Sequence, residues 1–278
     1  VAIGYQALKA QDAGADAYNV AIGYSAGENI STGVQNVLMG GKAGDALTTG
    51  GYNVAIGHEA LSAEDGHGKN VAIGWQALSD QNAGADAFNI GIGYNAGKAM
   101  TTGIRNVIMG GLAGDALNTG SNNIAIGYEA LTTEDGNGRN IAIGTNSLQN
   151  LNAGSDAYNV AVGFASGAAM TTGVQNTIVG AQAGDALTTG SYNTVFGYEA
   201  LTTEDAHSGN TAIGYQTLRV QDAGANAYNT AVGHQAGVAI STGINNTLVG
   251  ALAGDAIIGA DNNVAVGYNS LSATTVGA

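Results

Sequence analysis

The feature that most constrains this chain is an asparagine that returns at fixed intervals along its whole length. Fifteen asparagines, from Asn19 to Asn263, occupy one series of positions that begins with Asn19, Asn36, Asn53, Asn70 and Asn89. Three equal steps and one slightly longer step make up the series, and this set of four steps repeats. Each asparagine opens the motif Asn-(Val/Ile/Thr)-X-(bulky apolar)-Gly. Self-similarity at a fixed short period is the signature of a solenoid, in which each unit contacts only its neighbours.

The predicted coils group into a larger repeat that spans four of them. Four such super-repeats cover 1–69, 70–139, 140–209 and 210–278, and together they contain sixteen coils. We predict an all-β fold, a parallel β-solenoid or β-roll, in which residues 1–278 are a single repeat domain. Val1 is already in phase with the motif, so we expect the chain to be an excerpt of a longer protein.

One coil illustrates the predicted local structure. Ile90 and Ile92 alternate with a small residue, which is the period of a strand with one buried face, and Gly93 ends that strand. We expect a second short strand to follow, ending at a small residue such as Ala96. A large residue then follows, either directly, as at Leu78, or three positions later, as at Met100. Each coil would thus supply one large residue to each side of a narrow core: a bulky strand residue on one side and the later large residue on the other.

The regular spacing also marks residues with a structural role. Identical asparagines at one coil position are expected to hydrogen-bond along the stack. Glycine at the fifth motif position permits a positive φ or a close approach of two backbones. The markers in the first four complete motifs are Asn19, Asn36, Asn53, Asn70, Gly23, Gly40, Gly57 and Gly74.

Composition excludes several functions. The chain has 21 acidic and 7 basic residues and a formal net charge of -14, and such a surface repels nucleic-acid phosphates. It contains no cysteine, which excludes disulfides and thiolate metal sites. No apolar run approaches the ~20 residues of a membrane span, so we expect no membrane insertion in this segment.

Exposed aromatic residues are the candidate recognition surface. Twelve Tyr, three Phe and one Trp fall mostly at two coil positions, directly after the motif glycine or directly before the asparagine. We favour a ladder of rings that stabilises the roll. A subunit interface or a sugar-binding strip is the alternative. The candidate surface-recognition residues are Tyr5, Tyr24, Trp75, Tyr94, Tyr128, Tyr198 and Tyr215.

Acidic residues recur in the loops, where Ca²⁺ could bind. They form Glu64-Asp65-Gly66, Glu134-Asp135-Gly136 and Glu204-Asp205, and a Gly-Asp-Ala motif at Asp45, Asp115, Asp185 and Asp255. Paired carboxylates suit Ca²⁺, but a solvated turn is the favoured interpretation.

The remaining chemistry-bearing residues suggest neither a metal cluster nor catalysis. His67 and His207 share a loop position but lie two super-repeats apart, so they predict no cluster of histidines. No Ser/His/Asp arrangement repeats, and the glycine-rich stretches lack the Gly-Lys-Ser/Thr of a phosphate loop. We expect no enzyme, no cofactor and no catalytic or metal-binding residue.

The coil motif resembles two related sets of repeats. Residues 1–8 read Val-Ala-Ile-Gly-Tyr-Gln-Ala-Leu, which is similar to the head repeats of trimeric autotransporter adhesins. Residues 210–216 read Asn-Thr-Ala-Ile-Gly-Tyr-Gln, which is similar to repeats of phage tail-fibre proteins. The resemblance covers all sixteen coils and implies a left-handed roll and a parallel homotrimer. The present coils are longer than those of adhesin heads, which implies an added outward loop.

The resemblance implies the shaft or head of an extracellular fibre, on a virion tail fibre or a bacterial cell surface. Such a fibre would present its loops in several copies to a cell-surface glycan or protein receptor. Two alternatives stay open. One is a self-assembling extracellular filament or sheath. The other is an ice-binding solenoid, although its threonine ladder (Thr48-Thr49, Thr101-Thr102) is broken in half of the coils.

Overall fold

The computed structural model describes residues 1–14, 16–134, 136 and 138–273. It divides into an N-terminal unit, Val1–Arg139, and a C-terminal unit, Asn140–Ala278, each built from two of the super-repeats. Within the described residues every regular element is a short β-strand, and one strand lies in each repeat of the motif. The prediction of an all-β parallel solenoid with one coil per motif is therefore confirmed.

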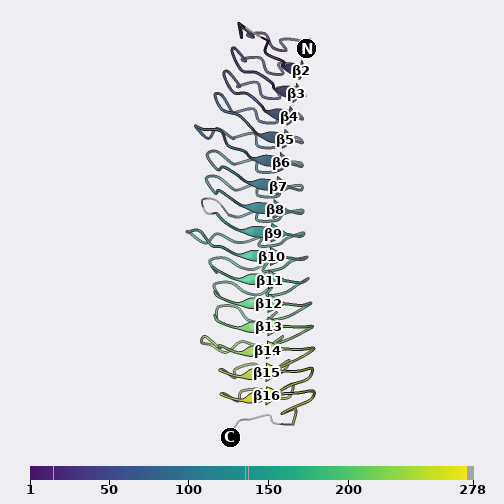
Figure 1. The fold of residues 1–278 in the computed structure, drawn as a ribbon, viewed down its shortest axis with the longest axis vertical. Helices are drawn as coiled ribbons and strands as arrows, with labels where there is room; N and C mark the ends of the chain where they lie inside the picture. Colours follow the sequence, from purple (N-terminus) through teal and green to yellow (C-terminus); the bar gives the residue numbers. More distant parts are fainter. Residues whose placement is uncertain (15, 135, 137, 274–278) are drawn as a thin grey trace. The chain divides into compact units, whose positions relative to one another are not determined.

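Each unit contains eight strands that follow one another in chain order (Figure 1). The strands of the N-terminal unit are β1 (Ala2–Ile3), β2 (Val20–Ile22), β3 (Val37–Met39), β4 (Val54–Ile56), β5 (Val71–Ile73), β6 (Ile90–Ile92), β7 (Val107–Met109) and β8 (Ile124–Ile126). The strands of the C-terminal unit are β9 (Ile141–Ile143), β10 (Val160–Val162), β11 (Thr177–Val179), β12 (Thr194–Phe196), β13 (Thr211–Ile213), β14 (Thr230–Val232), β15 (Thr247–Val249) and β16 (Val264–Val266).

Parallel pairing places equivalent motif positions directly above one another. Between β4 and β5, for example, Val54 is opposite Val71 and Ile56 is opposite Ile73. The pairing of the other neighbouring strands within a unit has the same register, including strands joined by one of the longer coils. Each motif position therefore forms a column of similar side chains along the stack, and the extra residues of the longer coils are absorbed outside the strands.

From β2 to β16 the middle residue of the strand faces inward, which is the reverse of our prediction that bulky residues such as Ile90 and Ile92 face the core. The middle residue of β4, Ala55, is fully buried, whereas Val54 and Ile56 are partly exposed. At β6 the reason lies in the preceding coil, where the side chain of Leu78 already fills this part of the core. A Cβ atom placed on Gly91, the middle residue of β6, would lie only 2.6 Å from Cγ of Leu78. Small residues therefore face inward at most strands and the large ones face outward.

The large residues that follow the strands do form the core, as predicted. Leu78 and Leu131 represent the coils in which the large residue comes early, and Met100 and Leu117 those in which it comes late. All four side chains are fully buried. Burial of such a side chain stabilises the fold by about 1.5–3 kcal/mol, so this column is a main source of stability.

The second strand that we predicted in each coil is absent from the described residues, and a series of turns takes its place. Gln76 and Leu78 have φ values of 51° and 49°, in the left-handed region. Their backbone N–H groups still donate to neighbouring coils, Gln76 to the oxygen of His58 (2.9 Å) and Leu78 to that of Ala96 (3.0 Å). Left-handed residues turn the chain sharply, and the narrow core leaves no room for an extended second wall.

The repeated asparagine bonds along the stack, as predicted. The backbone N–H of Asn53 donates to Oδ1 of Asn36 (2.9 Å), and the backbone N–H of Asn36 donates to Oδ1 of Asn19 (2.8 Å). The side-chain amide of Asn36 also donates to the backbone oxygen of Gly50 (2.9 Å). The asparagine column thus ties successive coils together, and at positions such as Asn36 the side-chain amide also fixes the turn beside it.

Candidate functional site

The outward strand face, made by the first and third residues of each strand, is an apolar surface that runs along the N-terminal unit. Its side chains are all aliphatic or methionine, without any charged or polar residue, and all are at least partly exposed. The residues of β2–β8 on this face are Val20, Ile22, Val37, Met39, Val54, Ile56, Val71, Ile73, Ile90, Ile92, Val107, Met109, Ile124 and Ile126. Contiguous apolar surfaces of this kind mark interaction sites.

The outward strand face of the C-terminal unit is divided into two columns. Its third-residue column stays apolar, whereas its first-residue column contains threonine in five successive strands. These threonines are aligned in register from β11 to β15. They are Thr177, Thr194, Thr211, Thr230 and Thr247. The Asn-Thr-X form of the motif predicts this ladder, which the loop threonines do not.

The candidate recognition aromatics form stacks on the surface. Tyr5 and Tyr24 have ring centroids 5.5 Å apart, and Trp75 and Tyr94 have centroids 5.1 Å apart with an interplanar angle of 9°. Tyr128 occupies the same coil position and is 52% exposed. A stacked ring uses its faces on its neighbours and presents its edge to solvent. Stacking covers one face of Tyr5, Tyr24 and Tyr94, and it contributes to the stability of the roll.

Histidines extend two of these stacks. His58 stacks on Trp75 (6.4 Å), and His234 stacks on Tyr215 (5.1 Å), which in turn stacks on Tyr198 (5.7 Å). The two histidines share one coil position, and the stacking accounts for both of them without a metal. In experiments on the loop histidines His67 and His207, substitutions of these two stacked histidines are therefore suitable controls.

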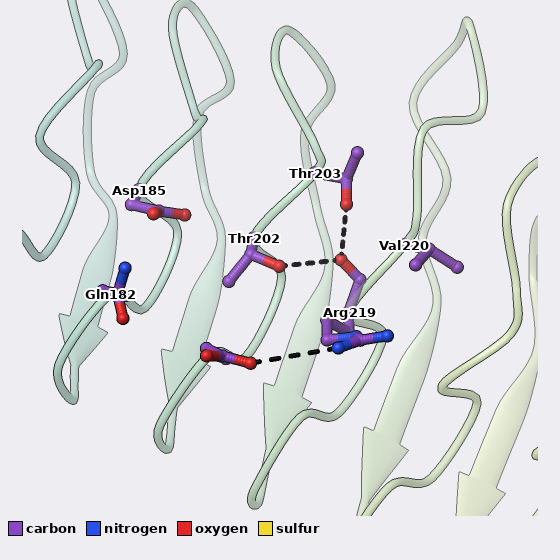
Figure 2. Close-up of a pocket in the computed structure, with 7 residues that line it drawn as sticks. Gln182, Asp185, Thr202, Thr203, Arg219 and Val220 are labelled. Carbon is purple, nitrogen blue, oxygen red and sulfur yellow. Dashed lines mark hydrogen bonds and ion pairs between the residues drawn. The ribbon is translucent and has the colours of Figure 1, made fainter.

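A polar groove of about 240 Å³ lies on the C-terminal unit. Figure 2 shows the hydroxyls of Thr202 and Thr203 pointing at a single oxygen, the backbone carbonyl of Arg219. The guanidinium of Arg219 lies 4.0 Å from the carboxylate of Glu199. Gln182, Asp185 and Val220 complete the lining. Most polar groups of the groove are therefore occupied in binding one coil to the next.

Asp185 is the groove residue with unused hydrogen-bonding capacity. Its Oδ1 atom is buried and has no hydrogen-bond partner, and burial raises the pKa of this carboxyl above its usual range. Glu199 behaves in the opposite way, because a hydrogen bond from the side chain of Gln216 lowers the pKa of its carboxyl.

The Glu-Asp loops are only partly the solvated turns that we predicted, because their glutamates are buried. The side chains of Glu64, Glu134 and Glu204 are fully buried, whereas Asp65 and Asp205 next to two of them are exposed, and Asp135 lies outside the described residues. The loop folds the glutamate back under the chain, because its carboxylate closes the turn. Oε1 of Glu64 accepts the backbone N–H of His67 at 3.1 Å, and the same bond occurs between Glu204 and His207 (3.0 Å).

This turn brings a histidine and several carboxylates together, which we did not predict. Nδ1 of His207 lies 2.6 Å from Oε1 of Glu204 and 3.9 Å from Oδ1 of Asp222 on the next coil. One ligand atom from each of Glu204, Asp205, His207 and Asp222 lies within 4.8 Å of the others. A comparison of the histidines with one another does not predict this cluster. The Glu-X-X-His spacing within the loop does.

Comparison with protein-family models, with curated proteins and with solved structures returned no match. The described residues contain no helix with the length and hydropathy that crossing a bilayer requires. The architecture alone therefore defines the class. The chain is a parallel β-solenoid repeat protein, and its function has to be inferred from its surfaces.

Proposed function

We propose that this chain is the shaft or head of an extracellular fibre whose copies associate through the outward strand face. The observation that carries this proposal is the pair of apolar columns on β2–β8, which run through seven successive coils without a polar residue. A solenoid cannot bury this face itself, because its own core is already filled by residues such as Leu78 and Met100. A second copy can cover it.

Self-association fits the charge distribution of this face. The chain carries a formal net charge of -14, and like charges at an interface would oppose the pairing of identical copies. The columns on β2–β8 contain only Val, Ile and Met, so copies can meet there without such repulsion. The resemblance to adhesin heads and tail-fibre repeats favours a left-handed roll and a parallel homotrimer, on a virion tail fibre or a bacterial cell surface.

The role we propose is mechanical and multivalent, without catalysis. Three copies would present each loop three times, which raises avidity for a repeated cell-surface glycan or protein receptor. The loops of the longer coils are candidate contact points, because they extend beyond the strands without disturbing their register.

Light scattering coupled to size exclusion tests the proposal. We expect the purified chain to have a mass near three times 27.4 kDa. Ile92→Lys places a charge in the middle of the outward strand face and should shift the mass toward that of one chain. Ile258→Lys is the matched control, because Ile258 is 49% exposed and lies outside that face. A wild-type monomer, or equal effects of the two variants, would refute association through this face.

Ice binding is the second candidate, and the threonine ladder of the C-terminal unit favours it. Five threonines in register on parallel strands give a regular array of hydroxyl and methyl groups. The loop threonines contribute less, because hydroxyls such as that of Thr188 donate to a backbone carbonyl of the next coil (2.6 Å). A thermal hysteresis measurement separates the two functions: activity that is lost in Thr211→Tyr would favour ice binding. Light scattering that shows open-ended polymers would instead favour a filament or sheath.

A further inference from the structure

We propose that Glu204, His207 and Asp222 form a site for a divalent metal ion of the zinc type, which joins the coil of β12 to the coil of β13. Glu204 and His207 belong to the turn after β12, whereas Asp222 belongs to the long coil after β13. A metal ion bound by all three would therefore link two successive coils of the C-terminal unit. This inference does not depend on the fibre proposal.

The distances suit a small metal ion after a minor adjustment. Zinc binds imidazole nitrogen and carboxylate oxygen at about 2.0–2.2 Å, so two of its tetrahedral ligands lie about 3.3 Å apart. The separations from Nδ1 of His207, 2.6 Å to Glu204 and 3.9 Å to Asp222, fall on either side of that value. Each needs to change by only about 0.7 Å to reach it, and Asp222 is free to move because its side chain is 53% exposed.

One carboxylate oxygen of this cluster is buried without a hydrogen-bond partner. The side chain of Glu204 is fully buried, yet its Oε2 atom has no hydrogen-bond partner. A cation bound by the Glu204 carboxylate would balance its buried charge, since buried charges are normally paired or bound to a metal.

The equivalent turn of the first super-repeat provides an independent observation. Glu64 is also fully buried with an unpartnered Oε2, and Nδ1 of His67 is buried without a hydrogen-bond partner. Nδ1 of His67 lies 3.6 Å from Oε1 of Glu64, which is too far for a hydrogen bond but close to the separation of two ligands on one metal ion. Asn82 stands where Asp222 stands in the later coil, so we expect this first turn to bind more weakly.

The ligand types select the metal. Ca²⁺ and Mg²⁺ take oxygen ligands, whereas imidazole together with carboxylates suits zinc and similar transition metals. The exposed carboxylate of Asp205, also within 4.8 Å of the other ligand atoms, or a water molecule, can complete four-coordination. We therefore expect Zn²⁺ to bind more tightly than Ca²⁺.

The chain itself suggests variants that should fold. Asn137 occupies the position of His207 in the second super-repeat, and Asn82 occupies that of Asp222 in the first. His207→Asn and Asp222→Asn therefore copy substitutions that the repeat already contains. His234→Asn is the control, because it removes a histidine whose ring stacks on Tyr215 outside the turn.

Calorimetric titration of the EDTA-treated, untagged chain with ZnCl2, together with thermal melting, tests the site. We expect saturable binding in the micromolar range and a higher melting temperature with zinc. His207→Asn and Asp222→Asn should each weaken zinc binding at the Glu204 turn, the tighter of the two sites, about tenfold or more. His234→Asn should not change it.

Three outcomes would overturn the proposal. The first is the absence of saturable zinc binding to the wild-type chain at micromolar concentrations. The second is binding by His207→Asn that equals the wild type. The third is a rise in melting temperature with CaCl2 that matches the zinc effect and survives His207→Asn, since that would assign the site to carboxylates alone.

Discussion

The asparagine ladder allows a quantitative prediction at Asn89. Its Oδ1 accepts the backbone N–H of Asn106 (2.8 Å), and its Nδ2 donates to Oε1 of Gln81 (2.7 Å) and to the backbone oxygen of Gly103 (2.7 Å). Oδ1 also accepts a longer bond from Nδ2 of Asn106 (3.3 Å), and Asn89→Ala removes all of these bonds in a fully buried place. A buried polar group that loses its partner costs about 1–3 kcal/mol. We therefore expect a loss of about 3–5 kcal/mol in the free energy of unfolding.

Asn70 is the matched comparison within the same ladder. Its Oδ1 accepts the backbone N–H of Asn89 (3.1 Å), but its Nδ2 is buried without a hydrogen-bond partner. Asn70→Ala breaks that one bond and also removes an unsatisfied donor, so we expect a loss of only about 1–2 kcal/mol. The two substitutions delete the same atoms from the same column, and they differ only in what those atoms bind.

Urea unfolding of both variants measures the difference, and amide hydrogen exchange locates it. In Asn89→Ala the N–H of Asn106 should exchange faster, because its acceptor is gone, while amides several coils away keep their protection. Equal losses in the two variants, or a loss below about 1 kcal/mol for Asn89→Ala, would refute the view that the ladder stabilises the stack through these bonds.

The backbone, the core and the groove each give a further prediction. Gly57→Ala should cost about 4 kcal/mol or more in urea unfolding, because φ is +137° and the new Cβ would lie 2.2 Å from the oxygen of Gly74. Gly84→Ala should cost only about 1 kcal/mol, since its φ is +68° and nothing lies within 4 Å; similar costs would argue against the close packing of coils. Leu117→Ala should destabilise by about 2–5 kcal/mol, and a smaller effect in thermal melting would mean that the core is looser than the structure shows. Asp185→Asn should stabilise the chain at pH 7, because the folded pKa of this carboxyl is raised and its charge opposes folding above that pKa. The gain should vanish below the ordinary pKa of 3.8, and a gain that grows toward acid would contradict this sign.

Much of the fold could be predicted from spacing alone. The return of Asn36, Asn53 and Asn70 at equal steps predicts coils in register, and the structure has that register. The buried leucines opposite the strands, such as Leu78, were predictable for the same reason. A period in the sequence becomes a column in space whenever each coil rests on the previous one, and this relation needs no knowledge of tertiary packing.

The candidate sites depended on packing that spacing does not reveal. Val54, Ala55 and Ile56 alternate, and this alternation is compatible with either face inward. The choice follows from the volume already occupied by the opposite wall, where a Cβ on Gly91 would collide with Leu78. The outward strand face, on which the proposed association rests, is a result of that choice.

The sequence by itself determined the coil length, the parallel stacking and the columns of asparagine and glycine, because these features follow from periodicity and local backbone geometry. Only the tertiary structure decided that Glu204 is buried and that Asp222, a full coil further along the chain, reaches His207 on the coil before it. The position of the extra residues in a longer coil determines which loop residues of neighbouring coils contact each other. That placement depends on the packing of the whole turn against its neighbours, and single-residue preferences do not encode it.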